Sequence, residues 1–480
     1  MWVRRAIFVM NHHCTKIMTP NNFSKRVLIA LPAFFLYLLL PAQVELKNFT
    51  GGKLTGTHEA ELVFGNQQVL YIDFYSENSF RMFYSPHGDK PHVPVAKPPA
   101  KILADNPRKP VGALQISDAG NEISIQSKKI KLTIDKKSGI LTAFNLAFNK
   151  QAFKLNKPIF VENDKSNIAL SEGTDEYFYG GGVQNGRFSH KGKAISIENQ
   201  NSWTDGGVAS PVPFYWSTSG YGLLWHTFKP GRYDFGLKER GTVRLFHNDS
   251  YLDVFIMISQ EPVQLLQGYY QLTGQALLLP KFGFYQGHLN AYNRDYWKED
   301  TTGKRGIRFE DGKYYTESQK DNGGILESLN GEKNNYQFSA RAVIVRYRQH
   351  DMPLGWILPN DGYGAGYGQT STLDSNIQNL KSFGDYARKN GVEIGLWTQS
   401  DLHPKQGISA LLQRDIVKEV RDAGVRVLKT DVAWVGAGYS FGLNGVADAA
   451  SVFAEYGSGA RPFIISLDGW AGTQRRSEER

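Results

Sequence analysis

The stretch that decides the fold is Val425–Asp431, which reads VRVLKTD. A short run rich in β-branched residues that closes on a lysine and an aspartate is typical of a buried strand and its C-terminal end. Because side chains alternate along a strand, Lys429 and Asp431 are expected on the same face. Such a pair can be a structural ion pair, or a catalytic carboxylate that a neighbouring ammonium keeps ionised. These residues alone leave both interpretations open.

The segment belongs to a repeat in which a helix ends at or near glycine and a strand follows. Strands are predicted at Val392–Trp397, Val425–Asp431 and Pro462–Leu467, and they begin 33 and 37 residues apart. Apolar positions at helical spacing predict the preceding helices, within 377–387, 408–423 and 446–456. This alternation indicates a parallel sheet, either a (β/α)8 barrel or a doubly wound sheet.

Two earlier strands complete the part of the barrel that the sequence contains. They are predicted at Phe282–Gly287 and Met352–Pro359. The polar, glycine-rich segment 296–337 between them has no clean period, and we interpret it as an inserted loop or hairpin. Residues 280–480 are therefore predicted to form a partial barrel of about five strands.

The preceding residues 44–279 have a different pattern. Short alternating segments such as Ile123–Gln126 and Ile130–Ile134 are separated by turn residues such as those of Asp135–Gly139. They predict a large β-sandwich, with the proline-rich Lys90–Pro110 as an extended loop across it. The predicted fold class is thus a multidomain α+β protein, with an N-terminal β-sandwich followed by a (β/α)8 barrel.

The first 43 residues are typical of a secretory signal peptide. Lys25 and Arg26 precede the apolar run Val27–Leu40, which is short for a membrane span, and a small-residue exit follows. Met18 would begin a compact signal, so we expect the true start there. The protein is predicted to be exported, to a bacterial periplasm or the cell exterior. Its only cysteine, Cys14, lies in the segment expected to be removed.

The charge balance excludes one class of partner. Five of the 55 Lys and Arg residues and none of the 46 acids lie in the first 43 residues, so the remainder has a net charge near +4. This balance, and the lack of basic runs with interleaved aromatics, argues against nucleic acid. The glycines of Gly362–Gly368 have the wrong spacing for a dinucleotide loop, and no His/Cys/acid group has ligand spacing. We therefore expect no cofactor and no metal.

Polar and aromatic side chains stand where each predicted barrel strand ends. They are Gln286, His288 and Asn290 after the first strand, Asn360 and Asp361 after the second, Trp397, Gln399 and Asp401 after the third, Lys429, Asp431 and Trp434 after the fourth, and Asp468 and Trp470 after the fifth. The C-terminal ends of barrel strands form the active-site face. Carboxylates that bind hydroxyls and aromatics that stack on pyranose rings predict a pocket for an oligosaccharide or glycoside.

Four motifs in this order are similar to those of one enzyme family. They are YFYGGG at Tyr177–Gly182, LPKFG at Leu279–Gly283, the strand Val427–Asp431, and RPFIISLDGWAGTQR at Arg461–Arg475. The chain resembles glycoside hydrolase family 31, the retaining α-glycosidases that include α-glucosidases, α-xylosidases and α-galactosidases. The resemblance implies a galactose-mutarotase-like N-terminal sandwich, with the first motif as a loop that reaches the active site.

The resemblance also implies roles for the strand-end residues. Asp431 matches the nucleophile, which forms a covalent glycosyl-enzyme through an oxocarbenium-like state. Asp361 matches an acid that binds sugar hydroxyls. Trp397 and Trp470 would be pocket walls, and Lys429 would hold Asp431 ionised. Trp434 and Asp468 complete the predicted substrate-binding set.

The sequence departs from the family pattern in two respects. Val432-Ala433-Trp434 and Leu467-Asp468 replace the usual residues after the nucleophile and after the fifth strand, which argues against ordinary maltose-type specificity. The Lys429-x-Asp431 arrangement and Asp468 look closer to an α-galactosidase subgroup of the family, as a hypothesis. The family acid/base is expected just beyond Arg475, where only residues 476–480 follow. We therefore interpret the chain as truncated and expect it to be inactive as written. The alternative is a non-catalytic, carbohydrate-binding or degenerate glycosidase.

Overall fold

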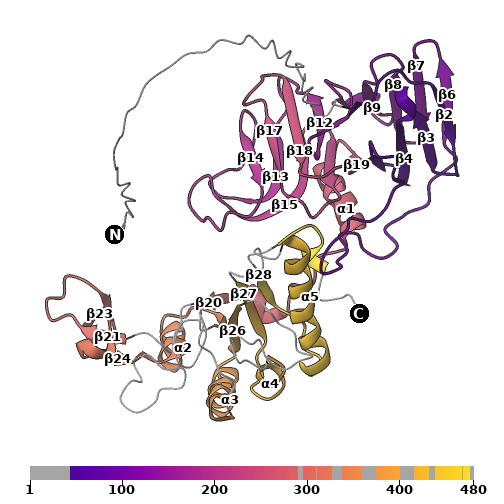
Figure 1. Cartoon of the computed structure of the whole chain (residues 1–480). Helices are drawn as coiled ribbons and strands as arrows, with labels where there is room; N and C mark the ends of the chain where they lie inside the picture. The colour runs from indigo at the N-terminus through magenta and orange to yellow at the C-terminus, as the bar shows by residue number, and fades with distance from the viewer. Residues whose placement is uncertain are drawn as a thin grey trace, which may run out of the picture. The chain divides into compact units, whose positions relative to one another are not determined.

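The computed structural model describes residues 44–289, 296–309, 311–326, 338–358, 374–399, 416–431, 438–466 and 469–475 (Figure 1). The chain divides into two units, 1–42 and 43–480, and all of the described residues belong to the second. The predicted signal peptide and Met18 start lie outside the described residues. No helix among the described residues is long and apolar enough to cross a membrane.

The N-terminal domain consists of three antiparallel sheets. The largest has the order β13 (Phe178–Gln184), β15 (Val208–Ser217), β16 (Tyr221–Trp225), β19 (Leu252–Ile258), β5 (Ser79–Tyr84), β4 (Val69–Ser76), β3 (Glu59–Val63) and β2 (Gly51–Leu54). The second has the order β1 (Val44–Glu45), β11 (Phe160–Glu162), β12 (Lys165–Ser171), β18 (Thr242–His247), β17 (Gly231–Phe235) and β14 (Ala194–Ile197). The third has the order β10 (Lys150–Lys154), β9 (Leu141–Asn145), β8 (Ile130–Asp135), β7 (Glu122–Gln126) and β6 (Gln115–Ala119).

Aromatic side chains join the two larger sheets. Phe178 of β13 stacks on Phe235 of β17 with ring centroids 4.7 Å apart, and Tyr215 of β15 lies 5.2 Å from Phe235. Residues at alternate positions of all three sheets belong to one buried cluster. The alternation seen in the sequence therefore marks the faces that meet, which is the arrangement of a β-sandwich.

The predicted turn between β8 and β9 is confirmed and shows why its residues are needed. The Asp135 carboxylate accepts hydrogen bonds from the backbone N–H and the hydroxyl of Ser138, at 2.7 and 2.6 Å. Gly139 has a φ of +72°, and a Cβ there would lie 1.8 Å from the carbonyl oxygen of Leu46. Only glycine fits this position.

Helix α1 (Pro262–Thr273) and the segment 85–114 pack against the sandwich, and Leu272 and Ile102 belong to its buried cluster. Residues 85–114 contain no helix or strand, as expected for the proline-rich loop. Gln271 of α1 donates to the carbonyl oxygen of Pro107 at 2.8 Å, which ties the helix to this segment.

The C-terminal part contains a five-stranded sheet in which all neighbours are parallel. Its order is β20 (Gln286–His288), β25 (Leu354–Ile357), β26 (Glu393–Gln399), β27 (Val427–Asp431) and β28 (Ile464–Ser466). Helices α2 (Ala340–Gln349), α3 (Asp374–Lys389), α4 (Ile416–Arg421) and α5 (Tyr439–Tyr456) accompany it (Figure 1).

All four of these helices contribute to the cluster that covers one face of the sheet. It contains Ile344 of α2, Phe383 of α3, Val420 of α4 and Phe453 of α5, together with Leu428 of β27. A doubly wound sheet has helices on both faces, whereas a barrel wall has them on one. The described strands therefore match part of a barrel wall, and closure into a (β/α)8 barrel stays a prediction.

Three sequence-based expectations about this part were wrong in detail. The predicted strand Phe282–Gly287 is largely a 3-10 turn, Lys281–Phe284, and only Gln286–His288 is extended. The segment expected to be a loop or hairpin holds a four-stranded antiparallel sheet of β22 (Ile307–Arg308), β23 (Tyr314–Ser318), β21 (Tyr296–Glu299) and β24 (Ile325–Leu326). The helix predicted within 446–456 begins earlier, at Tyr439.

Candidate active site

The candidate site lies on the face of the parallel sheet opposite the helix-covered one. There, Trp356, Trp397, Val427 and Phe463 form a separate apolar cluster. Val427 and Lys429 alternate with Leu428, which belongs to the helix-covered face. Lys429 therefore lies on the same face as Val427, one position nearer on that face to the C-terminal end of β27.

The register brings the predicted residues of two strands together. Trp397 pairs with Lys429, and Gln399 pairs with Asp431. Asp431 is the last residue of β27 and Gln399 the last of β26, so both stand at the C-terminal edge of the sheet. Trp397 is fully buried and Lys429 half-buried. The arrangement places a tryptophan and a lysine directly beside the strand end that carries the predicted nucleophile.

Trp470 is buried at 1% exposure and packs against the N-terminal domain. Its indole N–H donates to the carbonyl oxygen of Thr227 at 2.8 Å, and its ring stacks on Tyr439 at 3.9 Å. In addition, the backbone N–H of Gly469 donates to the hydroxyl of Ser210 at 3.1 Å. These contacts join the end of the described chain to the sandwich, and the pocket-wall role of Trp470 stays a prediction.

Several other predicted residues lie outside the described parts of the chain. These are Asp361, Trp434 and Asp468 of the substrate-binding set, and Asn290, Asn360 and Asp401 of the strand-end residues. His288 is described, and it lies toward helix α2 instead of the candidate site. Its Nδ1 is 3.2 Å from the hydroxyl of Tyr347, and burial lowers its pKa to about 4.

The motif Tyr177–Gly182 was expected to be a loop, and this was wrong. Residues 178–184 form β13, the strand at one edge of the largest sheet. Gly180 and Gly182 both have positive φ, and a Cβ on Gly182 would lie 2.1 Å from the carbonyl oxygen of Ser210. The glycines therefore serve the close, irregular pairing with β15.

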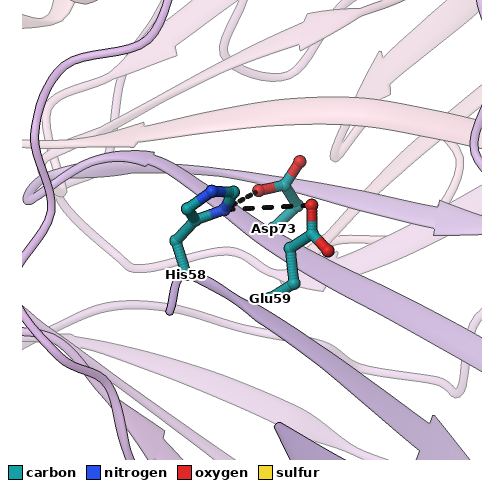
Figure 2. Close-up of side chains that lie close together, drawn as sticks. All are labelled: His58, Glu59 and Asp73. Atoms are coloured by element: carbon teal, nitrogen blue, oxygen red, sulfur yellow. Dashed lines mark hydrogen bonds and ion pairs between the residues drawn. The ribbon is translucent and has the colours of Figure 1, made fainter. Parts of the chain in front are cut away.

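One group of side chains among the described residues has the geometry of a metal site. His58 Nδ1 lies 3.0 Å from Asp73 Oδ1 and 3.9 Å from Glu59 Oε1 (Figure 2). However, the Arg108 guanidinium donates to both carboxylate oxygens of Asp73, one of them at 2.7 Å. The same guanidinium lies 3.9 Å above the ring of Tyr75. Because a fixed positive charge already satisfies Asp73, we interpret this group as an ion-pair cluster that joins residue 108 to β4.

Sequence reasoning missed a buried charged group in the N-terminal domain. The Asp253 carboxylate accepts bonds from Arg81 Nε and Nη2 and from His226 Nδ1, each at 2.7 Å. Asp253 and His226 are 1% exposed and Arg81 8%. Although burial opposes ionisation, the charges of His226 and Arg81 outweigh it and lower the pKa of Asp253. These residues lie far apart in sequence, so no local motif indicates the group.

Comparison with known proteins relates part of the N-terminal region to a known domain. Residues 69–234 match the model of the glycosyl hydrolase 31 N-terminal galactose mutarotase-like domain. An α-xylosidase, XylQ of Lactiplantibacillus pentosus, is 26% identical over 201 residues, which cover 40% of this chain and 26% of that protein. An α-xylosidase of Saccharolobus solfataricus is 28% identical over 171 residues, which cover 34% and 22%.

Solved structures share the fold at low sequence identity. A family 31 dextranase of Flavobacterium johnsoniae superposes with a TM-score of 0.66 and 13% identity, over 90% of this chain and 56% of that one. A family 31 α-xylosidase from a soil metagenome has a TM-score of 0.61 and 15% identity, over 89% and 67%. The chain thus spans little more than half of the dextranase. Residues 69–234 thus match the N-terminal domain of glycoside hydrolase family 31, and the curated relatives and the shared fold support a glycosidase of this family.

Proposed function

We propose that the protein is a retaining α-glycosidase that cleaves terminal α-linked sugars through a covalent intermediate on Asp431. The observation that carries the proposal is the position of Asp431 at the C-terminal end of β27, two residues after Lys429 and beside the last residue of β26. In parallel β/α enzymes this edge of the sheet is where the chemistry takes place. The match of residues 69–234 to the family 31 N-terminal domain supports the reaction class.

In the proposed reaction the Asp431 carboxylate attacks the anomeric carbon as the bond to the leaving oxygen breaks. The glycosyl-enzyme is then hydrolysed by water. A proton donor about 5–5.5 Å from the nucleophile serves the natural leaving group in retaining enzymes. Nothing among the described residues assigns that donor, so the proposal concerns the nucleophile and not the acid/base.

For the substrate, the relatives and the sequence favour different sugars. The three curated relatives are α-xylosidases, which puts α-xylosides first among the candidates. The Lys429-x-Asp431 arrangement and Asp468 instead favour the α-galactoside hypothesis, with α-glucosides as the third candidate. A panel of all three sugars therefore has to be tested.

The test uses glycosyl fluorides, because fluoride is a good leaving group that departs without a general acid. Release of fluoride from α-xylosyl, α-glucosyl and α-galactosyl fluoride would be followed in wild type and in Asp431→Asn. The proposal predicts turnover of one fluoride by wild type and loss of that turnover in the variant. Binding of the sugars without turnover, unchanged in Asp431→Asn, would instead favour the non-catalytic carbohydrate-binding alternative.

We also propose that the protein is exported. Lys25, Arg26 and the apolar run Val27–Leu40 support this. N-terminal sequencing of the protein recovered from the cell exterior or periplasm would test it. A mature N-terminus near residue 44 is expected, and retention of the apolar run would contradict the proposal.

A further inference from the structure

A pocket of about 500 Å³ lies in the N-terminal domain, far along the chain from β27. It is lined by residues 100–108, by Val93 and Pro94, and by the side chains of Tyr75 and His226. Its volume lies in the range typical of small-molecule sites. Neither the strand-end chemistry nor the family motifs involve these residues.

The pocket is built on the buried group of Arg81, His226 and Asp253. An ionised carboxylate can only accept hydrogen bonds, so the 2.7 Å contact with Asp253 places the imidazole proton on Nδ1 of His226. The Nε2 atom, on the other side of the ring, is left to face the pocket. It makes no hydrogen bond within the described residues, although the side chain of His226 is only 2% exposed and lines the pocket. Nε2 can therefore bond a ligand that enters the pocket.

Tyr75 supplies a second polar group to the same pocket. It is 6% exposed, and its hydroxyl makes no hydrogen bond within the described residues. The rings of Tyr75 and His226 both pack edgewise on Phe255, with centroids 4.8 and 5.5 Å away. One phenol and one imidazole nitrogen, both fixed by packing, thus border one cavity.

The charges around the pocket are already balanced. Arg108 is paired with Asp73, and Lys101 Nζ lies 3.2 Å from Asp105 Oδ1. Arg81 and His226 share Asp253. A charged ligand would disrupt these pairs, whereas a neutral ligand that both donates and accepts hydrogen bonds would use the two remaining groups.

The wall of the pocket is held in place from outside. The Arg475 guanidinium donates to the carbonyl oxygens of Lys101, Ile102 and Leu103 at 3.0, 2.6 and 2.9 Å. These bonds fix the backbone that lines the pocket before any ligand arrives. Preformed walls reduce the entropy cost of binding.

We propose that this pocket binds a neutral, polyhydroxylated ring the size of a free monosaccharide, with His226 Nε2 hydrogen-bonded to one sugar hydroxyl and the Tyr75 hydroxyl to another. None of the residues that line it belongs to β27 or to the predicted substrate-binding set. It would allow the protein to hold a sugar on its N-terminal domain independently of turnover at Asp431.

The test is photolabelling of the full chain with a thio-linked α-xyloside that carries a diazirine, followed by peptide mapping. Free xylose, glucose and galactose serve as competitors at millimolar concentration. The proposal predicts labelling within residues 93–108 that an excess of at least one of these sugars suppresses. Because the label is mapped to a peptide, the result does not depend on labelling near Asp431, and Asp431→Asn is expected to leave it unchanged.

Two matched pairs of variants sharpen the test. Val93 and Val95 are 69% and 79% exposed, but only Val93 lines the pocket. Val93→Trp is therefore expected to abolish the labelling, and Val95→Trp to preserve it. Tyr75→Phe should lower sugar affinity roughly three- to tenfold, the value of one hydrogen bond, while Tyr71→Phe on the same strand should not. Labelling that no sugar suppresses, or equal labelling in Val93→Trp and Val95→Trp, would overturn the proposal.

Discussion

Trp397 and Lys429 are register partners on the adjacent parallel strands β26 and β27. The pair lies on the side of the sheet opposite to the cluster formed with helices α2–α5. Val427 and Phe463 complete the apolar floor below the lysine. A cationic side chain is thus held over an apolar layer, two residues before the strand ends at Asp431, which is the setting expected for a nucleophilic carboxylate.

Replacement of Lys429 tests this relationship. Lys429→Met keeps an unbranched side chain but removes the charge that we expect to favour the ionised form of Asp431. We predict a loss of kcat/KM on the preferred glycosyl fluoride of roughly 10- to 100-fold, or about 1.4–2.8 kcal/mol of transition-state stabilisation. Lys381→Met on α3 is the matched control, because Lys381 pairs with Asp385 at the surface. An equal loss in both variants would contradict a role for Lys429.

The buried histidine His247 predicts a pH dependence of stability. Its Nδ1–H donates to the carbonyl oxygen of Lys229 at 2.8 Å, and the Tyr233 hydroxyl donates to Nε2 at 2.9 Å. Burial lowers its pKa to about 3. Below pH about 6.5, His247 is therefore protonated in the unfolded chain but stays neutral in the folded protein. Because the unfolded state binds the extra proton, the free energy of unfolding falls as the pH drops from about 6.5 toward 3.

The expected size of this effect is about 1 kcal/mol per pH unit between pH 6 and 5. His247→Phe removes the titrating group. The drop in unfolding free energy between pH 6 and 5 should therefore be smaller in this variant than in wild type, by about 1 kcal/mol. Denaturant titrations that follow the N-terminal domain at pH 6.0 and 5.0 would measure the difference. Equal slopes in the two proteins would show that His247 is not held neutral.

Arg475 is predicted to stabilise the contact between the C-terminal segment and the N-terminal domain. It is 4% exposed, and its guanidinium also donates to the carbonyl oxygen of Thr273, besides those of residues 101–103. Arg475→Ala leaves these buried carbonyls without their donor and should cost about 3 kcal/mol or more. Arg475→Lys should recover only part of this, because an ammonium cannot reproduce the planar set of donors.

Thermal unfolding of the full chain would measure the loss. Arg232→Ala is the control, because Arg232 is an exposed side chain on β17 and its removal should change stability by no more than about 0.5 kcal/mol. If Arg475→Ala melted like this control, the hydrogen bonds of Arg475 would not contribute to the stability of the chain.

The positions of the parallel strands were predictable from the sequence, because the pattern that marks them is local. Each of β26, β27 and β28 follows a helix and a glycine-containing turn, so periodicity alone located them within about two residues. The prediction of a strand at Phe282–Gly287 was wrong because its apolar residues suit either a strand or a packed turn. The protein uses them as a turn, with Phe282 lying 5.9 Å from Phe463 and Gly355 packed against the Phe282 carbonyl.

The candidate site was predictable only in part. Lys429 and Asp431 share a short segment, so strand alternation was enough to indicate them as a pair on one face. The burial of Trp470 against Tyr439 and Thr227 was not predictable, because it depends on how the end of the chain meets the sandwich. The Tyr75 and His226 pocket depends on residues that are neighbours only in the folded state.

The most direct test of the account is covalent trapping of the nucleophile. The full chain would be incubated with the 5-fluoro derivative of the preferred α-glycosyl fluoride, whose glycosyl-enzyme forms without a general acid and is hydrolysed slowly. Peptide mapping by mass spectrometry would then locate the label. The account predicts one sugar per chain, attached to Asp431 and absent in Asp431→Asn. A label on another carboxylate, or no label under conditions in which the sugar binds, would contradict it.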